Sequence, residues 1–222
     1  MVYRSGCQSG GDDDQPPVRG PRSSSNAGSG TTCAYDSGVP QPDALHFTGV
    51  PDADELIARD PVALLIGFAL DQQVPVSTAF AGPLKLQQRL GTLDPGRIAS
   101  TDPDTLERAF REKPAIHRFP GSMARRVQEL CALIADRYDG RAERLWTEAT
   151  DGDDLRRRIE ELPGFGEMKV KALGSVLAKR MGVDAAAGLI PAHPTLGDVD
   201  SPEALQRYQG WKREYKKASR GT

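Results

Sequence analysis

The 222-residue sequence predicts an all-α fold, and three observations lead to this prediction. Apolar residues recur at intervals of three and four, as in Val127, Leu130, Cys131, Ile134 and Tyr138, which places them on one helix face. Proline, glycine and aspartate divide the chain into segments of helical length. Alternating apolar and polar runs, which indicate strands, do not occur. We therefore expect about seven helices before the C-terminal tail.

The N-terminal segment, residues 1–45, is rich in Gly, Ser, Pro and Asp and has almost no apolar periodicity. Such a segment cannot bury enough apolar surface to offset the entropy lost on ordering, so it is predicted to be a disordered tail. Translated upstream sequence from a misassigned start is an alternative interpretation. A helical core is predicted over residues 46–183. A linker and a basic helix follow over residues 184–222, and this helix is expected to pack with the N-terminal part of the core.

The first helices of the core have clear start signals. A short helix with an acidic first turn begins at Asp52. Asp60 is then expected to cap a second helix that has Pro61 at its first position. Residues 62–70 of that helix are apolar on nearly all sides, so it should lie buried at the centre of the domain. It ends at the run Asp71-Gln72-Gln73-Val74-Pro75.

Further helices are predicted over residues 77–90 with a break at Gly82-Pro83, 104–111, 122–138 with Ser122 as its cap, a short one around Trp146, and 202–217. The loop from Lys113 to Ser122 contains an aromatic ring and a cation, which either contact DNA or simply pack the loop. In the last helix, Tyr208 and Trp211 belong to a partly apolar stripe that should dock it on the core.

A helix, a tight turn and a second helix are predicted over residues 153–181. Pro163 stops the first helix because it lacks a backbone donor and restricts the residue before it. Gly164 and Gly166 permit positive φ angles and leave the backbone amides uncovered. A Pro-Gly-x-Gly segment between two helices also has a simpler interpretation, namely that it is only a turn.

The amides after this turn begin the second helix, where unpaired N–H groups and the helix dipole favour an anion. Lys169 and Lys171 follow within the first turn and a half. A DNA backbone phosphate fits this arrangement best, because DNA binding is largely phosphate neutralisation. The net charge of −2 excludes a generally basic nucleic-acid-binding protein. Local basic patches remain around the hairpin and in the tail, although the tail charges also fit a solvated helix face.

The five residues from Leu162 to Gly166 resemble the hairpin of the helix-hairpin-helix (HhH-GPD) DNA glycosylase superfamily, which reads Leu-Pro-Gly-hydrophobic-Gly. The resemblance implies a two-lobed helical fold and a role in base excision repair. It also implies double-stranded, damaged DNA as the partner. On this basis Gly164, Phe165, Gly166, Lys169 and Lys171 are expected to contact DNA.

A second run, Gln72-Gln73-Val74-Pro75-Val76-Ser77, resembles the alkylbase branch of the same superfamily. In that branch a buried helix ends in Gln-Gln-Val-Ser or a similar sequence, and a glutamine fills or probes the gap left by an extruded base. Gln72 is the match to that glutamine, and Gln73 is expected to contact DNA beside it. A side-chain amide suits the task because it both donates and accepts hydrogen bonds. A polar helix end is the alternative interpretation.

The chemistry implied by the resemblance is cleavage of the N-glycosidic bond of a base flipped out of the duplex. In members that also nick the strand, the second residue after the last hairpin glycine is a lysine that forms a Schiff base. Met168 stands there and has no amine, so the covalent route is closed. Lys169 is rotated by about 100° around the helix and is expected to face phosphate. A monofunctional, water-using glycosylase is therefore predicted, with a non-catalytic DNA-binding protein or a hairpin used for protein contacts as alternatives.

The sequence departs from the superfamily pattern at the catalytic aspartate. At the spacing where the superfamily places it, this chain has Ala186. Asp184 is the carboxylate close by, but it lacks the flanking pattern. Asp184 is either a register-shifted catalytic residue or an ordinary polar residue at a helix end.

The cofactor and partner predictions follow from what the chain lacks. Its cysteines, Cys7, Cys33 and Cys131, do not have metal-ligand spacing, so the iron–sulfur cluster of some superfamily members is not expected. No cofactor is predicted, although the hairpin carbonyls leave room for a monovalent cation. No apolar run of about 18 residues and no signal core occur, so no membrane partner is predicted. A cytoplasmic monomer is expected.

Overall fold

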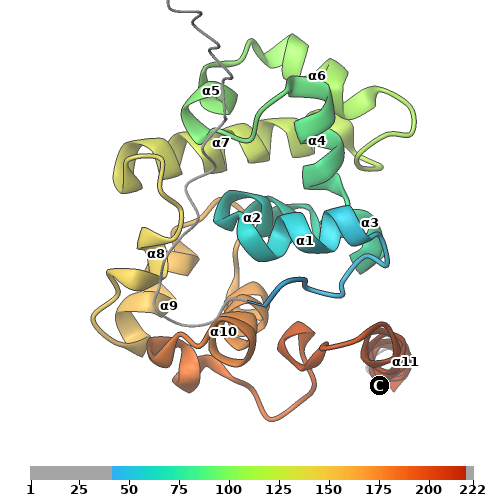
Figure 1. Ribbon diagram of the computed structural model, residues 1–222, viewed down its shortest axis with the longest axis vertical. Coiled ribbons are helices and arrows are strands. Elements are labelled where there is room, and N and C mark those ends of the chain that lie inside the picture. The colour runs from blue at the N-terminus through green and yellow to red at the C-terminus, as the bar shows by residue number, and fades with distance from the viewer. Residues whose placement is uncertain (1–41, 219–222) are drawn as a thin grey trace, which may run out of the picture. The chain divides into compact units, whose positions relative to one another are not determined.

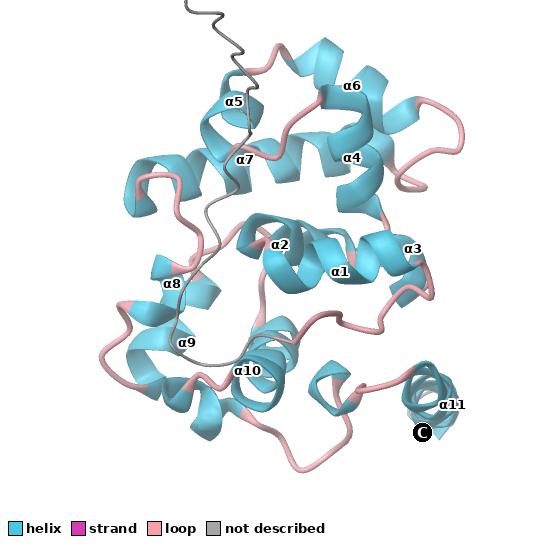
Figure 2. Ribbon diagram, viewed as in Figure 1, coloured by secondary structure: helices cyan, strands magenta, loops and turns pink. Residues whose placement is uncertain are grey.

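The computed structural model describes residues 42–218, which all belong to one compact unit. Within this range the regular elements are α-helices and short 3₁₀ helices, and no strand is present (Figure 2). The all-α prediction is therefore confirmed. Most of the predicted disordered tail, residues 1–41, lies outside the described residues. None of the described helices is both long and apolar enough to cross a membrane.

The described helices are, in chain order, α1 (Pro51–Arg59), α2 (Pro61–Leu70), α3 (Val76–Phe80), α4 (Gly82–Leu90), α5 (Pro95–Ser100), α6 (Pro103–Arg111), α7 (Pro120–Tyr138), α8 (Arg144–Thr147), α9 (Gly152–Glu160), α10 (Glu167–Met181), η1 (Asp184–Leu189), η2 (Leu196–Asp198) and α11 (Pro202–Ala218).

Helix α2 lies at the centre of the first group of helices, where it contacts α1, α3, α4 and α7 (Figure 1). The Asp60 carboxylate accepts hydrogen bonds from the amides of Val62 and Ala63, at 2.8 and 3.2 Å, so the predicted cap is confirmed. Every residue from Val62 to Leu70 is buried. The prediction of a central buried helix is therefore confirmed, and its C-terminal end carries the Gln72 loop.

Two local predictions are wrong. Helix α5 was not predicted, because its six residues are too few to show a periodic face, although Asp94 caps it by accepting from the Arg97 amide at 2.7 Å. Helix α7 begins at Pro120 rather than after Ser122. Proline suits the first helical position because its missing N–H is not needed there, so the helix starts three residues earlier.

The second group of helices is organised around α10, which contacts α9, η1 and η2. It shares one continuous hydrophobic core with the first group. The first turn of α10 lies against the C-terminal end of α2, where the Lys169 ammonium donates to the Ala69 carbonyl at 3.2 Å. Helix α11 contacts η2, and the Lys212 ammonium lies 4.0 Å from the carboxylate of Asp71. The C-terminal end of α2 therefore forms a junction with the first turn of α10 and the middle of α11.

Candidate functional site

The hairpin between α9 and α10 is a tight turn closed by a hydrogen bond. The Phe165 amide donates to the Leu162 carbonyl at 3.0 Å, and Gly164 between them has a φ of +79°. This is the position of a type II turn that favours glycine. A Cβ on Gly164 would also lie 2.8 Å from the Nε of Arg126 on α7. Glycine is therefore required at this position for two reasons.

Gly166 departs from the prediction in its backbone angle but leaves the helix amides uncovered, as predicted. Its φ is −104°, so the prediction of a positive φ is wrong for this residue. Gly166 is the residue that precedes α10, no side chain caps this helix end, and a Cβ on Gly166 would meet open space. Uncapped amides at the start of a 15-residue helix attract an anion through their hydrogens and the helix dipole. The hairpin therefore keeps the geometry expected of a phosphate site.

Lys169 does not face this anion site, which corrects the prediction. Its ammonium donates to the Ala69 carbonyl and lies 5.1 Å from the centre of the Phe165 ring. Burial lowers the pKa of Lys169 to about 8, with Asp71 opposing the shift and Arg126 adding to it. The step around α10 thus turns this side chain inward, onto α2, rather than outward to phosphate.

Phe165 and Lys171 differ in how far their side chains reach the surface. The Phe165 side chain is 5% exposed and belongs to the core, so only its backbone is available to DNA. The predicted DNA contact of Phe165 is therefore wrong for its side chain and stays a prediction for its backbone. Lys171 lies half-buried at the surface and forms an ion pair with Glu167 at 2.6 Å. Because surface pairs are weak, Lys171 can exchange this partner for a phosphate.

Side chains of α7 and of the loop that precedes α7 contact the Gln72 loop. Arg126 Nη1 donates to Gln72 Oε1 at 2.6 Å, and His117 Nε2 lies 3.0 Å from the Gln72 carbonyl oxygen. Because His117 Nδ1 accepts from the Phe119 amide, Nε2 carries the hydrogen and the ring is neutral. Burial lowers the pKa of His117, which favours this neutral form. Gln73 is exposed and has a φ of +56°, a strained angle for a residue other than glycine.

The loop over residues 112–119 lies beside the Gln72 loop because of the His117 contact. Its Phe119 side chain is 42% exposed, and the Arg118 guanidinium lies 4.7 Å from the ring centre. An exposed ring and a cation next to the Gln72 loop are groups that stack on bases and contact phosphates. The structure therefore places this loop at the same surface as Gln73.

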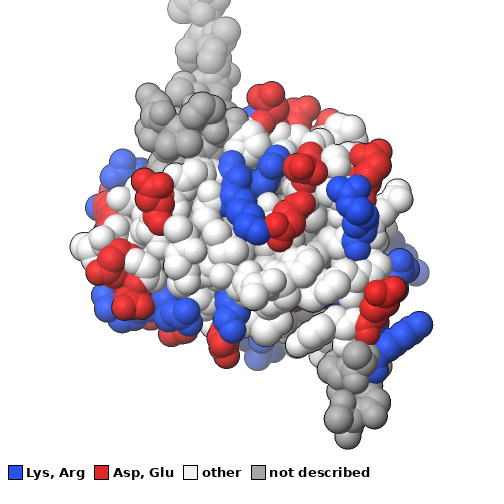
Figure 3. Space-filling view, turned by 90° about the horizontal axis from the view of Figure 1, so that it is seen from below, with Lys and Arg blue, Asp and Glu red and all other residues white. Residues whose placement is uncertain are grey.

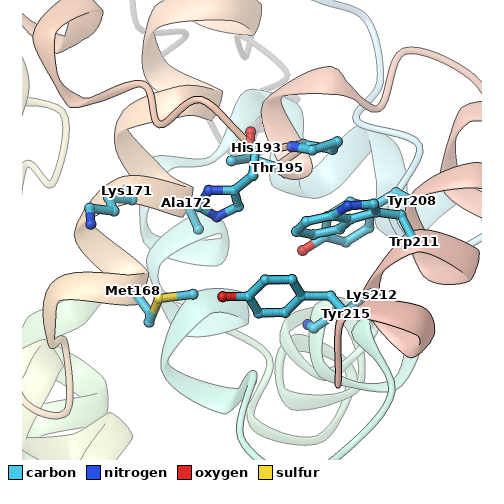
Figure 4. Close-up of a pocket in the computed structure, with 10 residues that line it drawn as sticks. Met168, Lys171, Ala172, His193, Thr195, Tyr208, Trp211, Lys212 and Tyr215 are labelled. Atoms are coloured by element: carbon cyan, nitrogen blue, oxygen red, sulfur yellow. The ribbon is translucent and has the colours of Figure 1, made fainter. Parts of the chain in front are cut away.

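A pocket of about 250 Å³ lies between α10 and α11 (Figure 4). Its lining residues are Met168, Lys171, Ala172, His193, Pro194, Thr195, Tyr208, Trp211, Lys212 and Tyr215. The rings of His193 and Tyr215 lie 5.5 and 5.3 Å from that of Trp211, each at an interplanar angle of 25°. Stacked rings of this kind offer flat faces to a planar ligand.

The pocket includes residues that the sequence did not identify as a site. Tyr208 and Trp211 were predicted only to dock the last helix, and His193 and Tyr215 had no predicted role. Met168 is 65% exposed and lines the pocket from the first turn of α10. It occupies the position that the resemblance gives to a nucleophilic lysine, but its side chain has no amine. Burial and the nearby Asp71 raise the pKa of Tyr208 to about 12, so its phenol stays neutral.

Asp184 is remote from both the turn and the pocket. It is exposed and follows the C-terminal end of α10, whereas the turn precedes the N-terminal end. The 15 residues of α10 separate the two ends by about 22 Å. The carbonyl of the next residue, Ala185, lies 3.1 Å from a Cβ placed on Gly152 at the start of α9. The structure therefore does not bring Asp184 to the site.

Two other carboxylates lie closer to the pocket. Asp198 accepts from the Thr195 amide at 2.8 Å and pairs with Lys179, so its oxygens have structural partners. Asp71 follows α2 and lies 4.0 Å from the Lys212 ammonium, and Lys212 lines the pocket. From the sequence, Asp71 was identified only as part of the run that ends a helix.

The charges on one face of the molecule are mixed. In Figure 3, Lys and Arg side chains alternate with Asp and Glu around a broad uncharged surface, without forming one continuous basic patch on that face.

Among residues 42–218, no group of three or more His, Cys, Asp or Glu side chains is placed to hold a metal ion. Cys131 is buried with a free thiol, and Cys7 and Cys33 lie outside the described residues. The cation at the hairpin carbonyls stays a prediction.

Comparison with known proteins gives one match. Residues 66–220 match the family model described as HhH-GPD superfamily base excision DNA repair protein. The matched range includes the Gln72 loop, the hairpin and all the residues that line the pocket. No curated protein and no solved structure matches the chain.

Proposed function

Because the chain belongs to the HhH-GPD superfamily of base excision DNA repair proteins, we propose that it is a monofunctional DNA glycosylase. Membership in this superfamily implies DNA as the partner and base excision repair as the process. The finer proposal is that the protein hydrolyses the N-glycosidic bond of a damaged base in double-stranded DNA. The observation that carries it is the pocket of stacked rings beside the first turn of α10.

The hairpin binds the DNA backbone, and the pocket binds the extruded base. The amides after Gly166, with Lys171 nearby, hold a backbone phosphate. The same first turn of α10 carries Met168 into the pocket, so a nucleotide held at the hairpin has its base within reach of the rings. A base must leave the stack before its glycosidic bond is accessible, and ring faces offset the lost stacking.

Water is the proposed nucleophile. Met168 has no amine, and the Lys169 ammonium is directed to the Ala69 carbonyl. The amines that line the pocket, Lys171 and Lys212, are opposite Glu167 and Asp71 respectively. Neither of these amines stands at the position that the superfamily gives to a Schiff-base lysine, which Met168 occupies here.

A non-catalytic DNA-binding protein is the second candidate function. It is favoured by the position of Asp184, which is exposed beyond the far end of α10 and is not among the residues that line the pocket. In that case the hairpin and the Gln72 loop would bind DNA, and the pocket would hold a base without cleaving its bond.

Base release from lesion-bearing duplexes tests the proposal. Duplexes with uracil, alkylated adenine, oxidised guanine or hypoxanthine are incubated with the protein, and hot alkali then reveals abasic sites. We expect release from at least one duplex, and no covalent complex after borohydride treatment. A borohydride-trapped complex would contradict the water route. Salt-dependent binding without release from any lesion would favour the second candidate.

A further inference from the structure

We propose that Asp71, rather than Asp184, is the catalytic carboxylate that faces the deoxyribose of the extruded nucleotide. This inference rests on the proposed glycosylase function and deepens it. Three observations carry it: the position of Asp71 at a helix end that disfavours a negative charge, the lack of a hydrogen-bond donor to its carboxylate among residues 42–218, and its neighbours at the pocket.

Asp71 lies where a carboxylate weakens a helix. It is the C-terminal cap of α2, and its amide donates to the carbonyls of Gly67 and Phe68. The C-terminal end of a helix carries partial negative charge, so an anionic side chain is unfavourable there and a cation or an amide is preferred. Helix stability therefore does not explain an aspartate at this position.

The Asp71 carboxylate also differs from the other aspartates that are not exposed. Among residues 42–218, Asp54, Asp60 and Asp154 each accept hydrogen bonds from backbone amides. No group described in this range donates a hydrogen bond to the Asp71 carboxylate, and Lys212 at 4.0 Å is too distant for one. Its side chain is only 20% exposed. Withdrawing a carboxylate from water without a donor costs stability, which is typical of a functional group.

The neighbours of Asp71 belong to the pocket. Lys212, its ion-pair partner, and Tyr208, whose pKa it helps to raise, both line the pocket from α11. On the α10 side, its charge opposes the lowering of the Lys169 pKa, and Lys169 follows Met168 at the pocket mouth. Asp71 thus pairs with a residue that lines the pocket and directly precedes Gln72 in the chain.

Neither of the two lysines beside Asp71 donates a hydrogen bond to its carboxylate. Lys212 is 47% exposed, so solvent screens its ammonium. Lys169 has a pKa of about 8 and donates to a carbonyl rather than to Asp71. The field of the Asp71 carboxylate therefore stays available to a cationic ligand that approaches it.

This field suits the sugar in glycosidic hydrolysis. The bond from C1′ to the base breaks, and both electrons leave with the base, which takes up a proton from solvent. The sugar then carries positive charge shared between C1′ and O4′, and the Asp71 carboxylate stabilises it. Water attacks C1′ to form the new C–O bond, and its proton passes to Asp71 and then to solvent. One water molecule is consumed for each base released.

Binding of a charged sugar mimic tests this inference without requiring the correct lesion. One duplex carries a pyrrolidine ring in place of a deoxyribose, with a protonated amine near the position of C1′. A matched duplex carries a neutral tetrahydrofuran ring. We expect the wild-type protein to bind the charged duplex about tenfold more tightly, as for a hydrogen bond to a charged group. Asp71→Asn should bind both duplexes equally, whereas Asp184→Asn should keep the wild-type preference.

Stability separates catalysis from a structural role. Asparagine is favourable at a helix C-terminal end and removes the charge, so Asp71→Asn should unfold at a urea concentration equal to or higher than wild type. A structural aspartate would instead lose stability. Asp71→Glu keeps the charge and should retain part of the preference for the pyrrolidine duplex, which provides a second variant if the first does not fold.

The possible outcomes distinguish this inference from the proposed function. A charge preference that survives in Asp71→Asn, or that disappears in Asp184→Asn, overturns the role of Asp71. A wild-type protein that prefers the tetrahydrofuran duplex to an intact one but ignores the charge overturns Asp71 alone. A wild-type protein that binds both of these abasic mimics no more tightly than intact DNA overturns the glycosylase proposal and this inference with it.

Discussion

Arg126 Nη1 donates a hydrogen bond to Gln72 Oε1 at 2.6 Å, and this bond joins α7 to the loop that follows α2. Arginine has donors and no acceptor, so the oxygen of the amide must face it and the NH₂ group faces away. The same guanidinium lies against Gly164 of the hairpin. Arg126 therefore contacts both segments that we propose to bind DNA, and the Gln72 NH₂ group on the side away from Arg126 is a donor.

Removing the Arg126 donor should weaken this junction. Arg126→Met keeps the side-chain length but leaves Gln72 Oε1 without its partner, so we expect a loss of about 1–2 kcal/mol in the free energy of unfolding. Urea denaturation measures this loss. The exposed neighbour Arg125 provides the matched control, since Arg125→Met should change the stability by less than about 0.5 kcal/mol. Equal effects of the two substitutions would show that the bond to Gln72 contributes nothing.

The two hairpin glycines should respond differently to alanine. Gly164→Ala introduces a Cβ at positive φ and against Arg126, so it should destabilise the protein by about 1–3 kcal/mol. Gly166→Ala points its methyl group into open space and should cost less than about 1 kcal/mol. Thermal unfolding compares the two. Because the Gly166 methyl lies at the uncapped amides, this variant should instead lose affinity for duplex DNA in a salt titration.

Lys169 should make stability depend on pH in the alkaline range. Its pKa is lowered from 10.5 in the unfolded chain to about 8 in the folded protein, so between these values the unfolded state binds more protons. The free energy of unfolding should therefore rise as pH increases from about 8 to about 10. Lys169→Met has no titrating group and should lack this rise, whereas Lys171→Met should retain it. Urea denaturation at several pH values measures the difference, and parallel curves for wild type and Lys169→Met would contradict the burial of the amine.

Trp211 should carry much of the binding of an extruded base. Its ring stacks with those of His193 and Tyr215, and a base loses about 1–3 kcal/mol when a stacking partner is replaced by alanine. Trp211→Ala should therefore reduce kcat/KM for base release about tenfold or more, while binding to intact duplex stays near the wild-type value. Arg207→Ala on the same helix is the control. Unchanged base release in Trp211→Ala would show that the base binds elsewhere.

The sequence by itself determined the local structure of this protein. Asp60 and Pro61 start α2, the unbroken apolar run buries it, and Pro163 with Gly164 makes the hairpin turn. Each of these features depends on the backbone preferences of a few successive residues, so it can be predicted from residue types alone. The same residues support the superfamily assignment, which the match over residues 66–220 shows.

The tertiary structure alone decided which side chains meet. Lys169 donates to Ala69, a residue 100 positions earlier in the chain, so its inward direction could not be predicted from helix rotation. The position of Asp71 at the junction and the stack of His193 on Trp211 have the same origin. These contacts depend on how helices far apart in the sequence pack together, because packing fixes the direction of a side chain whose local preferences allow several.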